Sequence, residues 1–235
     1  MRKALGIGCS VIGVLYVLGM LGCWGTRKAV QHEPEFYRRV LQVEPQRQVE
    51  AGDELEQTVL DLHNNTRLPG YWEACFTEEQ INGWLASDLP DKFPNTLPAG
   101  VQDPRVVIEQ GYARLACRYE HGSVLTVISL ALEVHLTEEP NTLAFRVSRL
   151  RAGVVPVSFA RFLDPIRDAA RQGNLPVRWS ETDGDPVALV TIPTEHEDYA
   201  HANIFLESVQ LLDRAIHLAG RTEAEGGTER RREGG

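Results

Sequence analysis

A stretch of thirteen residues, 124–136, carries an apolar side chain at nearly every second position, and it constrains the fold more than any other part of the sequence. The positions of this parity are Val124, Thr126, Ile128, Leu130, Leu132, Val134 and Leu136. Such alternation predicts a β-strand with one buried face. At about 3.3 Å per residue the strand would extend about 43 Å, against about 17–20 Å for an ordinary strand. A strand of this length favours a sheet that curls around something apolar. Leu125 and Val127 indicate that its first half is buried on both faces.

Shorter alternating segments on either side predict an antiparallel meander around this strand. They cover residues 106–108, 115–119, 143–147, 175–181 and 187–192. The sequences between them are typical of tight turns. These are His121-Gly122, Glu139-Pro140-Asn141 and Asp183-Gly184. Because the apolar parity slips before Leu150, we expect a β-bulge at Ser148-Arg149.

Helical spacing of apolar residues predicts helices before and after the meander. Two of them, separated at Pro45, form a neck, and the second ends near Asn64. Thr77 and Gln80 form a capping box that opens a further helix, which gives way to a Pro-rich link from Pro90. The expected apolar positions of the second neck helix are Leu55, Val59 and Leu62, and those of the capped helix are Ile81, Trp84, Leu85 and Leu89. The most regular helix carries Phe159, Phe162, Leu163, Ile166 and Ala170, and a last one carries Phe205, Val209, Leu212 and Ile216.

Residues 4–25 contain no charged side chain and are bracketed by Arg2-Lys3 and Arg27-Lys28. As a helix they would reach about 33 Å, which matches the apolar thickness of a bilayer. We expect an uncleaved single-pass membrane anchor. A lipoprotein signal at Cys23 and a cleaved secretory signal are alternatives that fit the surrounding residues less well. The basic residues at the start slightly favour a body outside the cytoplasm, held at the cell membrane.

The predicted fold class is α+β: an N-terminal transmembrane helix, followed by a curled antiparallel β-meander packed on a long amphipathic helix. The expected organisation has five parts. They are an anchor (1–28), a helical neck (29–70), an α+β core domain (71–193), a C-terminal helix (194–220) and a disordered tail (221–235). The tail is expected to be disordered because it is charged and rich in glycine.

The charge balance argues against a nucleic-acid partner. The chain has a formal charge of −9, with 24 basic and 33 acidic residues. The first 28 residues hold four basic residues and no acid, so the remainder carries 20 basic against 33 acidic residues, or −13. A body this acidic would repel a phosphate backbone. Outside the anchor the cysteines are Cys75 and Cys117, which either pair as a disulfide or remain separate thiols.

No strong catalytic or metal motif stands out. His196 and His201 lie five residues apart, which places them on different sides of a helix rather than at the i, i+4 spacing of a zinc pair. Asp183 and Asp185 lack the rest of a calcium loop and are interpreted as a turn. The serines have no nucleophile-elbow context. We therefore expect no enzymatic activity, no catalytic residue, no metal and no cofactor.

The remaining hypothesis concerns the apolar residues of the long strand and the phenylalanine-rich helix. They either seal one core or leave a groove for a lipid or another apolar ligand. The groove residues would be Ile128, Leu130, Leu132, Phe145, Phe159, Phe162 and Ile166, with Arg149 and Arg151 placed to contact a head group. The bilayer itself would be bound through residues 4–25. The alternative function is a non-enzymatic interaction or scaffold module with a protein partner in the cell envelope.

Three segments carry a resemblance to a known family. Phe76 to Leu85, Leu150 to Ile166 and Leu175 to Trp179 resemble motifs of small bacterial membrane-anchored proteins of unknown function. The turn at Glu138 to Asn141 and the predicted C-terminal helix depart from that pattern. More distantly, the layout resembles the tubular lipid-binding (TULIP-like) fold, in which a long helix lies in a curled sheet. That resemblance implies an apolar ligand and carries over no catalytic residue.

Overall fold

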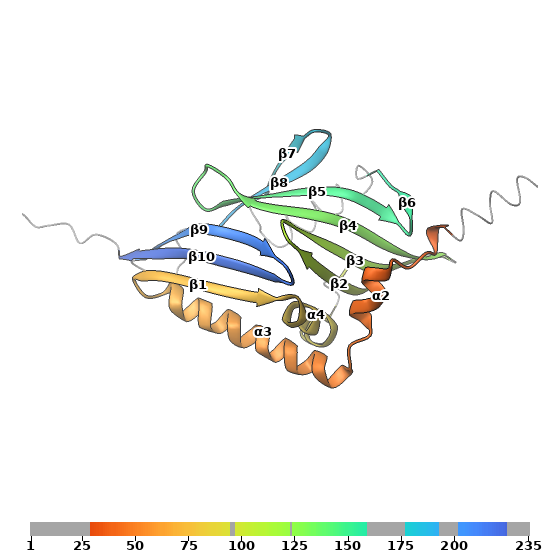
Figure 1. The fold of residues 1–235 in the computed structure, drawn as a ribbon, viewed down its shortest axis with the longest axis horizontal. Helices are drawn as coiled ribbons and strands as arrows, with labels where there is room; N and C mark the ends of the chain where they lie inside the picture. Colours follow the sequence, from red (N-terminus) through yellow and green to blue (C-terminus); the bar gives the residue numbers. More distant parts are fainter. Residues whose placement is uncertain (1–28, 95–96, 123, 159–176, 193–201, 225–235) are drawn as a thin grey trace, which may run out of the picture.

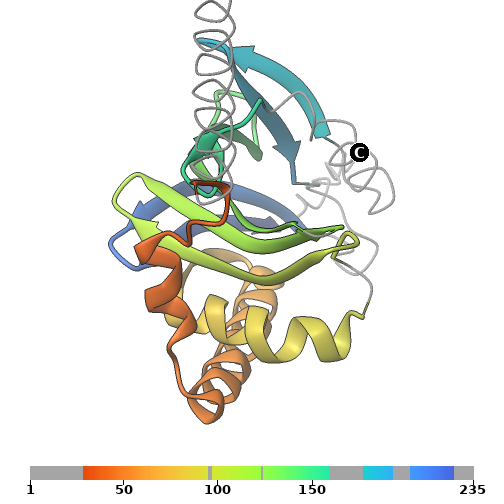
Figure 2. The same ribbon diagram turned by 90° about the vertical axis from the view of Figure 1, so that its right-hand side faces the viewer.

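The computed structural model describes residues 29–94, 97–122, 124–158, 177–192 and 202–224, and these residues form an α+β fold (Figures 1 and 2). These described residues form two antiparallel sheets and three helices, and the sheets are not closed. The predicted anchor at 4–25 and the predicted helix at 159–170 lie outside these ranges. No helix within the described ranges is long and apolar enough to cross a bilayer.

The larger sheet is the predicted meander. Its strand order is β2-β3-β4-β5-β8-β7, and a short β6 pairs with β5. The strands are β2 (Val101–Glu109), β3 (Tyr112–His121), β4 (Val124–Leu136), β5 (Thr142–Ala152), β6 (Val155–Pro156), β7 (Val177–Thr182) and β8 (Asp185–Thr191). The prediction of one continuous strand over residues 124–136 is therefore confirmed. The predicted turns at His121-Gly122, Glu139–Asn141 and Asp183-Gly184 are also found between these strands.

The predicted bulge is present and lies one residue further along. Ser129 pairs with Arg151 and Ala131 pairs with Ser148, so two residues of β5 face the single residue Leu130 on β4. The first residue of the bulge, Arg149, has a φ of +54°. This left-handed conformation is typical of glycine at the first position of such a bulge.

The smaller sheet corrects the prediction of a C-terminal helix. Residues 202–224 form a hairpin, β9 (Ala202–Leu212) and β10 (Ala215–Ala224), and β10 also pairs with β1 (Gly70–Thr77), which the sequence analysis did not anticipate. The spacing of Phe205, Val209 and Ile216 suits a helix, but Leu206 and Leu211 are the buried residues, and a turn with Arg214 at a φ of +61° separates the strands. Residues 221–224, expected in the disordered tail, end β10.

The three helices start where the sequence predicted them. They are α2 (Glu35–Leu41), α3 (Pro45–Thr66) and α4 (Glu78–Lys92). The Thr77–Gln80 capping box is formed: the Gln80 amide N donates to Thr77 Oγ1 at 3.2 Å, and the Thr77 amide N donates to Gln80 Oε1 at 2.9 Å. Helix α4 continues through Pro90 instead of ending there. Figure 2 shows α3 and α4 together beneath the sheets.

The buried face of α4 is more polar than its apolar spacing suggested. Ile81, Trp84 and Leu85 are only partly buried, whereas Glu78, Asn82 and Asp88 are buried along with Leu89. Glu78 and Asn82 are buried because α4 packs beside β2, an edge strand of the larger sheet, whose backbone groups need partners on that side. Asp88 is buried against Gly52 of α3.

Asn82 and Glu78 satisfy the open edge of β2. The Asn82 amide donates to the Val106 carbonyl O at 2.7 Å and accepts from the Val106 amide N at 2.8 Å. The Ile108 amide N donates to Glu78 Oε2 at 2.8 Å, and the Ile108 carbonyl O accepts from the Arg214 amide N at 3.0 Å. The N-terminal part of α4 and the β9–β10 turn therefore act as an additional strand along this edge.

Asn141 closes the edge of the smaller sheet in the same way. This buried residue of the β4–β5 turn donates from its amide to the Ile204 carbonyl O at 2.6 Å and accepts from the Leu206 amide N at 2.7 Å. Its φ of +52° is a conformation that asparagine tolerates well. The two sheets are thus joined through the Asn141 side-chain amide as well as through apolar packing.

The apolar packing differs from the predicted parity of β4. Val127 and Ala131, which lie on the opposite parity, are buried, and Val127 packs with Tyr37 and Ala116 beneath α2. Ile128, Leu130 and Leu132 are only partly buried. A second cluster of Val106, Ile108, Ala113 and Leu211 lies between the sheets. Burial on both faces, which was expected for the first half of β4, is found at Thr126 and at Val127 beneath α2, whereas Leu125 is half exposed. The expected parity is wrong further along, because Ala131 is buried while Leu130 and Leu132 are only partly buried.

The Asn82→Leu substitution should destabilise the fold strongly. It leaves the Val106 amide and carbonyl groups buried without partners, which costs about 2–4 kcal/mol of the free energy of unfolding. Urea denaturation of the full chain in an uncharged detergent measures this. Asn64→Leu, the same change at an exposed site on α3, should stay within about 0.5 kcal/mol of the wild type. Equal stability of the two variants would contradict the edge role of Asn82.

Candidate functional site

A pocket of about 450 Å³ brings three of the predicted site residues together: Leu130, Arg149 and Arg151. It lies between the start of α2, strands β3 and β4, and the end of β5. We call it the arginine pocket. Its lining residues are His32, Pro34, Glu35, Phe36, Arg114, Ser129, Leu130, Ala131, Arg149, Arg151, Gly153 and Val154.

The β-bulge aims Arg149 at this pocket. Because β5 has one extra residue here, Leu150 is buried, while Arg149 and Arg151 on either side of it are exposed. The guanidinium of Arg149 lies 5.7 Å from the centre of the Tyr112 ring. Stacking on an aromatic ring restricts the side chain and leaves the N–H edge of the guanidinium available.

Arg114 is the pocket residue that sequence reasoning missed. Its guanidinium lies 4.4 Å above the centre of the Phe36 ring and pairs with the Glu109 carboxylate, which also accepts a hydrogen bond from the Tyr112 hydroxyl. Its buried Nε has no hydrogen-bond acceptor within the described part of the chain. The Glu109 carboxylate therefore fixes both Arg114 and the Tyr112 ring, against which Arg149 stacks.

The pocket also adjoins the first described residues of the chain. The Ala29 carbonyl O accepts from the Val154 amide N at 3.0 Å, and the Val30 carbonyl O accepts from Thr126 Oγ1 at 2.6 Å. Gly153 makes this close approach possible, since a Cβ there would lie 2.2 Å from the Ala29 carbonyl O. The segment that follows the predicted anchor is thus fastened beside Arg151.

The electrostatics of the pocket oppose those of the whole chain. Three arginines and one glutamate line it, which gives a net charge of +2 with His32 neutral, in a chain of formal charge −9. Glu109 pairs with Arg114, but no described carboxylate pairs with Arg149 or Arg151. The pocket is therefore suited to an anion.

The other predicted groove residues are not gathered there. Ile128 lies opposite Cys117, Leu132 opposite Ala113, and Phe145 opposite Val134, all partly buried within the sheet. Phe159, Phe162 and Ile166 lie outside the described residues. Within the described ranges, the predicted groove thus contributes only Leu130 to the arginine pocket.

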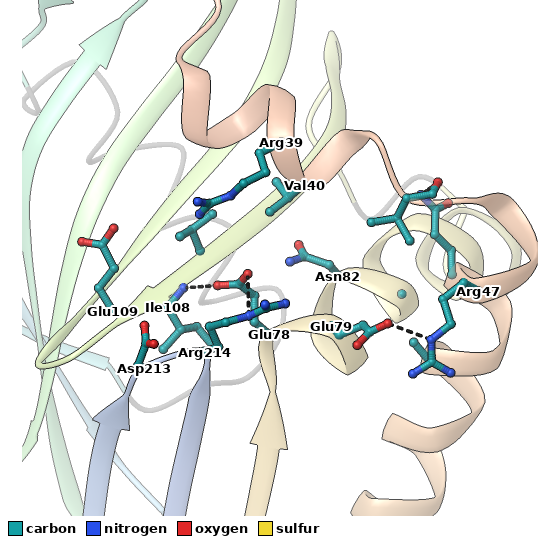
Figure 3. Close-up of a pocket in the computed structure, with 15 residues that line it drawn as sticks. Arg39, Val40, Arg47, Glu78, Glu79, Asn82, Ile108, Glu109, Asp213 and Arg214 are labelled. Atoms are coloured by element: carbon teal, nitrogen blue, oxygen red, sulfur yellow. Dashed lines mark hydrogen bonds and ion pairs between the residues drawn. The ribbon is translucent and has the colours of Figure 1, made fainter.

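A second pocket, of about 600 Å³, lies where α3, α4, β2 and the β9–β10 turn meet (Figure 3). We call it the mixed-charge pocket. Arg39, Glu109, Asp213 and Arg214 gather around it, and a third hollow that shares Arg39, Glu109 and Arg114 connects it to the arginine pocket along α2. The two carboxylates that α4 brings to this pocket already have partners: buried Glu78 accepts a hydrogen bond from the Ile108 amide N, and partly exposed Glu79 pairs with Arg47 at 2.7 Å. This pocket is therefore largely structural.

The remaining acidic and histidine motifs also have structural roles or lie elsewhere. Asp53, Glu56 and Asp88 bring their carboxylates together, but the Lys92 ammonium already pairs with Glu56 and with Asp88, the latter at 2.8 Å. The pKa of Asp88 is lowered: burial raises it, and hydrogen bonds from Lys92 and Ser87 outweigh that effect.

Asp183 and Asp185 of the β7–β8 turn stabilise the larger sheet through Arg146 of β5. Asp185 pairs with Arg146 at 2.8 Å, with Asp183 further away at 3.6 Å, as expected of a structural turn. His196 and His201 lie outside the described residues. Cys75 and Cys117 are free thiols, so the disulfide that the sequence left open is not formed.

Comparison of the chain with known protein families, with curated proteins and with solved structures gave no match. The resemblance to small membrane-anchored proteins and to the tubular lipid-binding fold remains a prediction. The function has to be argued from the geometry of the site alone.

The two thiols should differ strongly in reactivity. Burial raises the pKa of the Cys117 thiol to about 11, so at pH 8 its thiolate fraction is about a hundredfold below that of an ordinary thiol. Iodoacetamide labelling of the full chain at pH 8, followed by peptide mass spectrometry, should modify exposed Cys75 first and Cys117 about a hundredfold more slowly. Labelling of Cys117 should accelerate as the pH rises towards 11 and should match that of Cys75 in guanidinium chloride. Equal rates in the folded protein would contradict this and would show that the face of β3 that carries Cys117 is open to solvent.

Proposed function

We propose that this protein is a membrane-tethered domain outside the cytoplasm that binds a lipid, with the lipid's anionic head group held by Arg149 and Arg151. The observation that carries the proposal is the place of the arginine pocket beside residues 29–32. The predicted anchor ends at Gly25, only four residues before Ala29. Residues in an extended chain span at most about 3.6 Å each, so a bilayer entered at Gly25 would lie within about 15 Å of the pocket.

The lining of the pocket suits the polar end of a lipid. The guanidinium groups of Arg149 and Arg151 supply several N–H donors to an anionic group. Leu130, Ala131 and the half-exposed Val154 supply apolar contacts next to them. A lipid would place its charged group among the arginines and its first methylene groups against these side chains. The predicted groove around Phe159 and Phe162 would extend the apolar contact.

A second candidate is an interaction module of an envelope assembly. The solvent-facing side of α3 in the neck favours it, because Val49, Val59 and Leu60 are each about half exposed. Apolar side chains exposed on a helix mark a contact surface when they form one patch. Lipid binding is preferred because the arginine pocket is a defined site.

Lipid retention by the full chain tests the proposal. Protein purified in an uncharged detergent and examined by native mass spectrometry should retain added phosphatidylglycerol in preference to phosphatidylcholine. A double variant, Arg149→Gln with Arg151→Gln, should bind phosphatidylglycerol about 30-fold more weakly, since each arginine near a lipid surface contributes about 1 kcal/mol.

The matched control removes the same charge elsewhere. Arg178 and Arg221 are about half exposed and form surface ion pairs with Glu139 and Glu207. The double variant Arg178→Gln with Arg221→Gln should keep the wild-type affinity within about twofold, because such surface pairs contribute little. The absence of any retained lipid in the wild type, or equal losses in the two double variants, would refute the proposal.

A further inference from the structure

We infer that the arginine pocket is a phosphate site in which Arg114, Arg149 and Arg151 surround one phosphate group, and that the fold accepts backbone strain at Arg149 to build it. The inference rests on the proposed function in that the phosphate would be part of a lipid head group. It goes further by naming the group bound, by adding Arg114 and by assigning a role to the bulge.

The conformation of Arg149 is the first observation. With a φ of +54° at the first position of the bulge, the residue occupies a backbone region where glycine is favoured. Of the other non-glycine residues with positive φ, three are the asparagine and aspartates Asp103, Asn141 and Asp183, which tolerate it. Arg149 has no such local compensation. Strained residues of this kind cluster at binding sites, where the side chain is needed.

The second observation is that two of the guanidinium groups are held in place by the protein itself. Arg114 lies on the Phe36 ring and Arg149 on the Tyr112 ring, and the Glu109 carboxylate holds both Arg114 and the Tyr112 hydroxyl. These contacts restrict both side chains before any ligand arrives, which reduces the entropy lost on binding. Arg114 lines the pocket, and its buried Nε has no hydrogen-bond acceptor among the described residues.

The number and origin of the arginines favour phosphate over a carboxylate. Arg114 comes from β3, whereas Arg149 and Arg151 come from the bulged end of β5, so donors reach the pocket from two strands. A carboxylate offers two oxygens in a plane, whereas a phosphate offers up to four in a tetrahedron and pairs with guanidinium groups bidentately. A lipid phosphodiester and a free phosphate share this chemistry.

The Arg149→Gly variant separates binding from folding. Glycine relieves the strain at this φ, so Tm of the full chain in uncharged detergent should rise by about 2–4 °C. The affinity for inorganic phosphate, measured by isothermal titration calorimetry, should fall at least tenfold. The matched control is Arg214→Gly, which changes another arginine at positive φ, in the β9–β10 turn away from the arginine pocket. It should keep the wild-type phosphate affinity.

A second variant and a second probe complete the test. Arg151→Gln should also lower phosphate affinity at least tenfold, with Tm within about 2 °C of the wild type. Titration with phosphatidylglycerol in the same detergent distinguishes the sources of phosphate. Binding of inorganic phosphate without retention of lipid would support the phosphate site and refute the lipid function. Retention of lipid by the wild type and by Arg149→Gly alike would overturn the phosphate site and the role of Arg149 in holding the head group, and would leave lipid binding itself standing. Wild-type phosphate affinity in Arg149→Gly would also overturn the inference.

Discussion

The architecture depends on two asparagine side chains that replace missing β-strands. A primary amide offers one acceptor and a pair of donors in nearly the geometry of a peptide group, so it can pair with both backbone groups at the edge of a strand. Asn82 does this for β2 and Asn141 does it for β9. Because both sites are buried, loss of either amide would leave backbone groups unsatisfied where water cannot reach them. The edges are thereby closed, and each closure also fastens one part of the fold to another.

The arginine pocket is a consequence of that fastening. Asn82 and Glu78 hold α4 against β2. Strand β2 also anchors α2, because the Tyr37 hydroxyl donates to the Asp103 carbonyl O of β2 at 2.6 Å. Tyr37 is fully buried, so α2 is fixed over the same face of the sheet from which Arg114 projects. Phe36 packs against the same cluster as Tyr37, so the position of Phe36, and of Arg114 stacked on it, follows from the burial of Tyr37.

The sequence predicted those parts of the fold in which a local pattern of residues is compatible with only one backbone conformation. The alternation over 124–136, the turn residues and the Thr77 capping box each favour a single backbone conformation, and β4, its hairpins and α4 follow. Residues 202–224 were misread because the spacing of Phe205, Val209 and Ile216 fits a helix as well as a twisted hairpin with a bulge at Ala219–Gly220. Pairing with β1, about 140 residues earlier in the chain, decides between them, and no local pattern reports such a contact.

The candidate site was only partly predictable for the same reason. Arg149 and Arg151 could be found because arginines cluster at the end of a predicted strand, close to the parity slip that marks the bulge. Arg114 gives no such signal: on β3 it occupies the polar parity and resembles a surface residue, and only the placement of α2 brings Phe36 beneath it. The burial of Glu78 and Asn82 was likewise invisible, because a helix that packs beside a strand edge needs polar groups where a helix that packs on a sheet face needs apolar ones.

The attachment of residues 29 and 30 has a mechanical consequence. The Ala29 carbonyl O accepts a hydrogen bond from Val154, in the turn between β5 and β6, and the Val30 carbonyl O accepts one from Thr126 on β4. A pull on the chain ahead of Ala29 would first load these two hydrogen bonds, and it would reach α2 only after they broke. The residues between Ala29 and α2 would then be released, which would lengthen the connection to the domain. If the proposed anchor holds the domain, these two hydrogen bonds would set both the distance and the orientation at which it is held under tension.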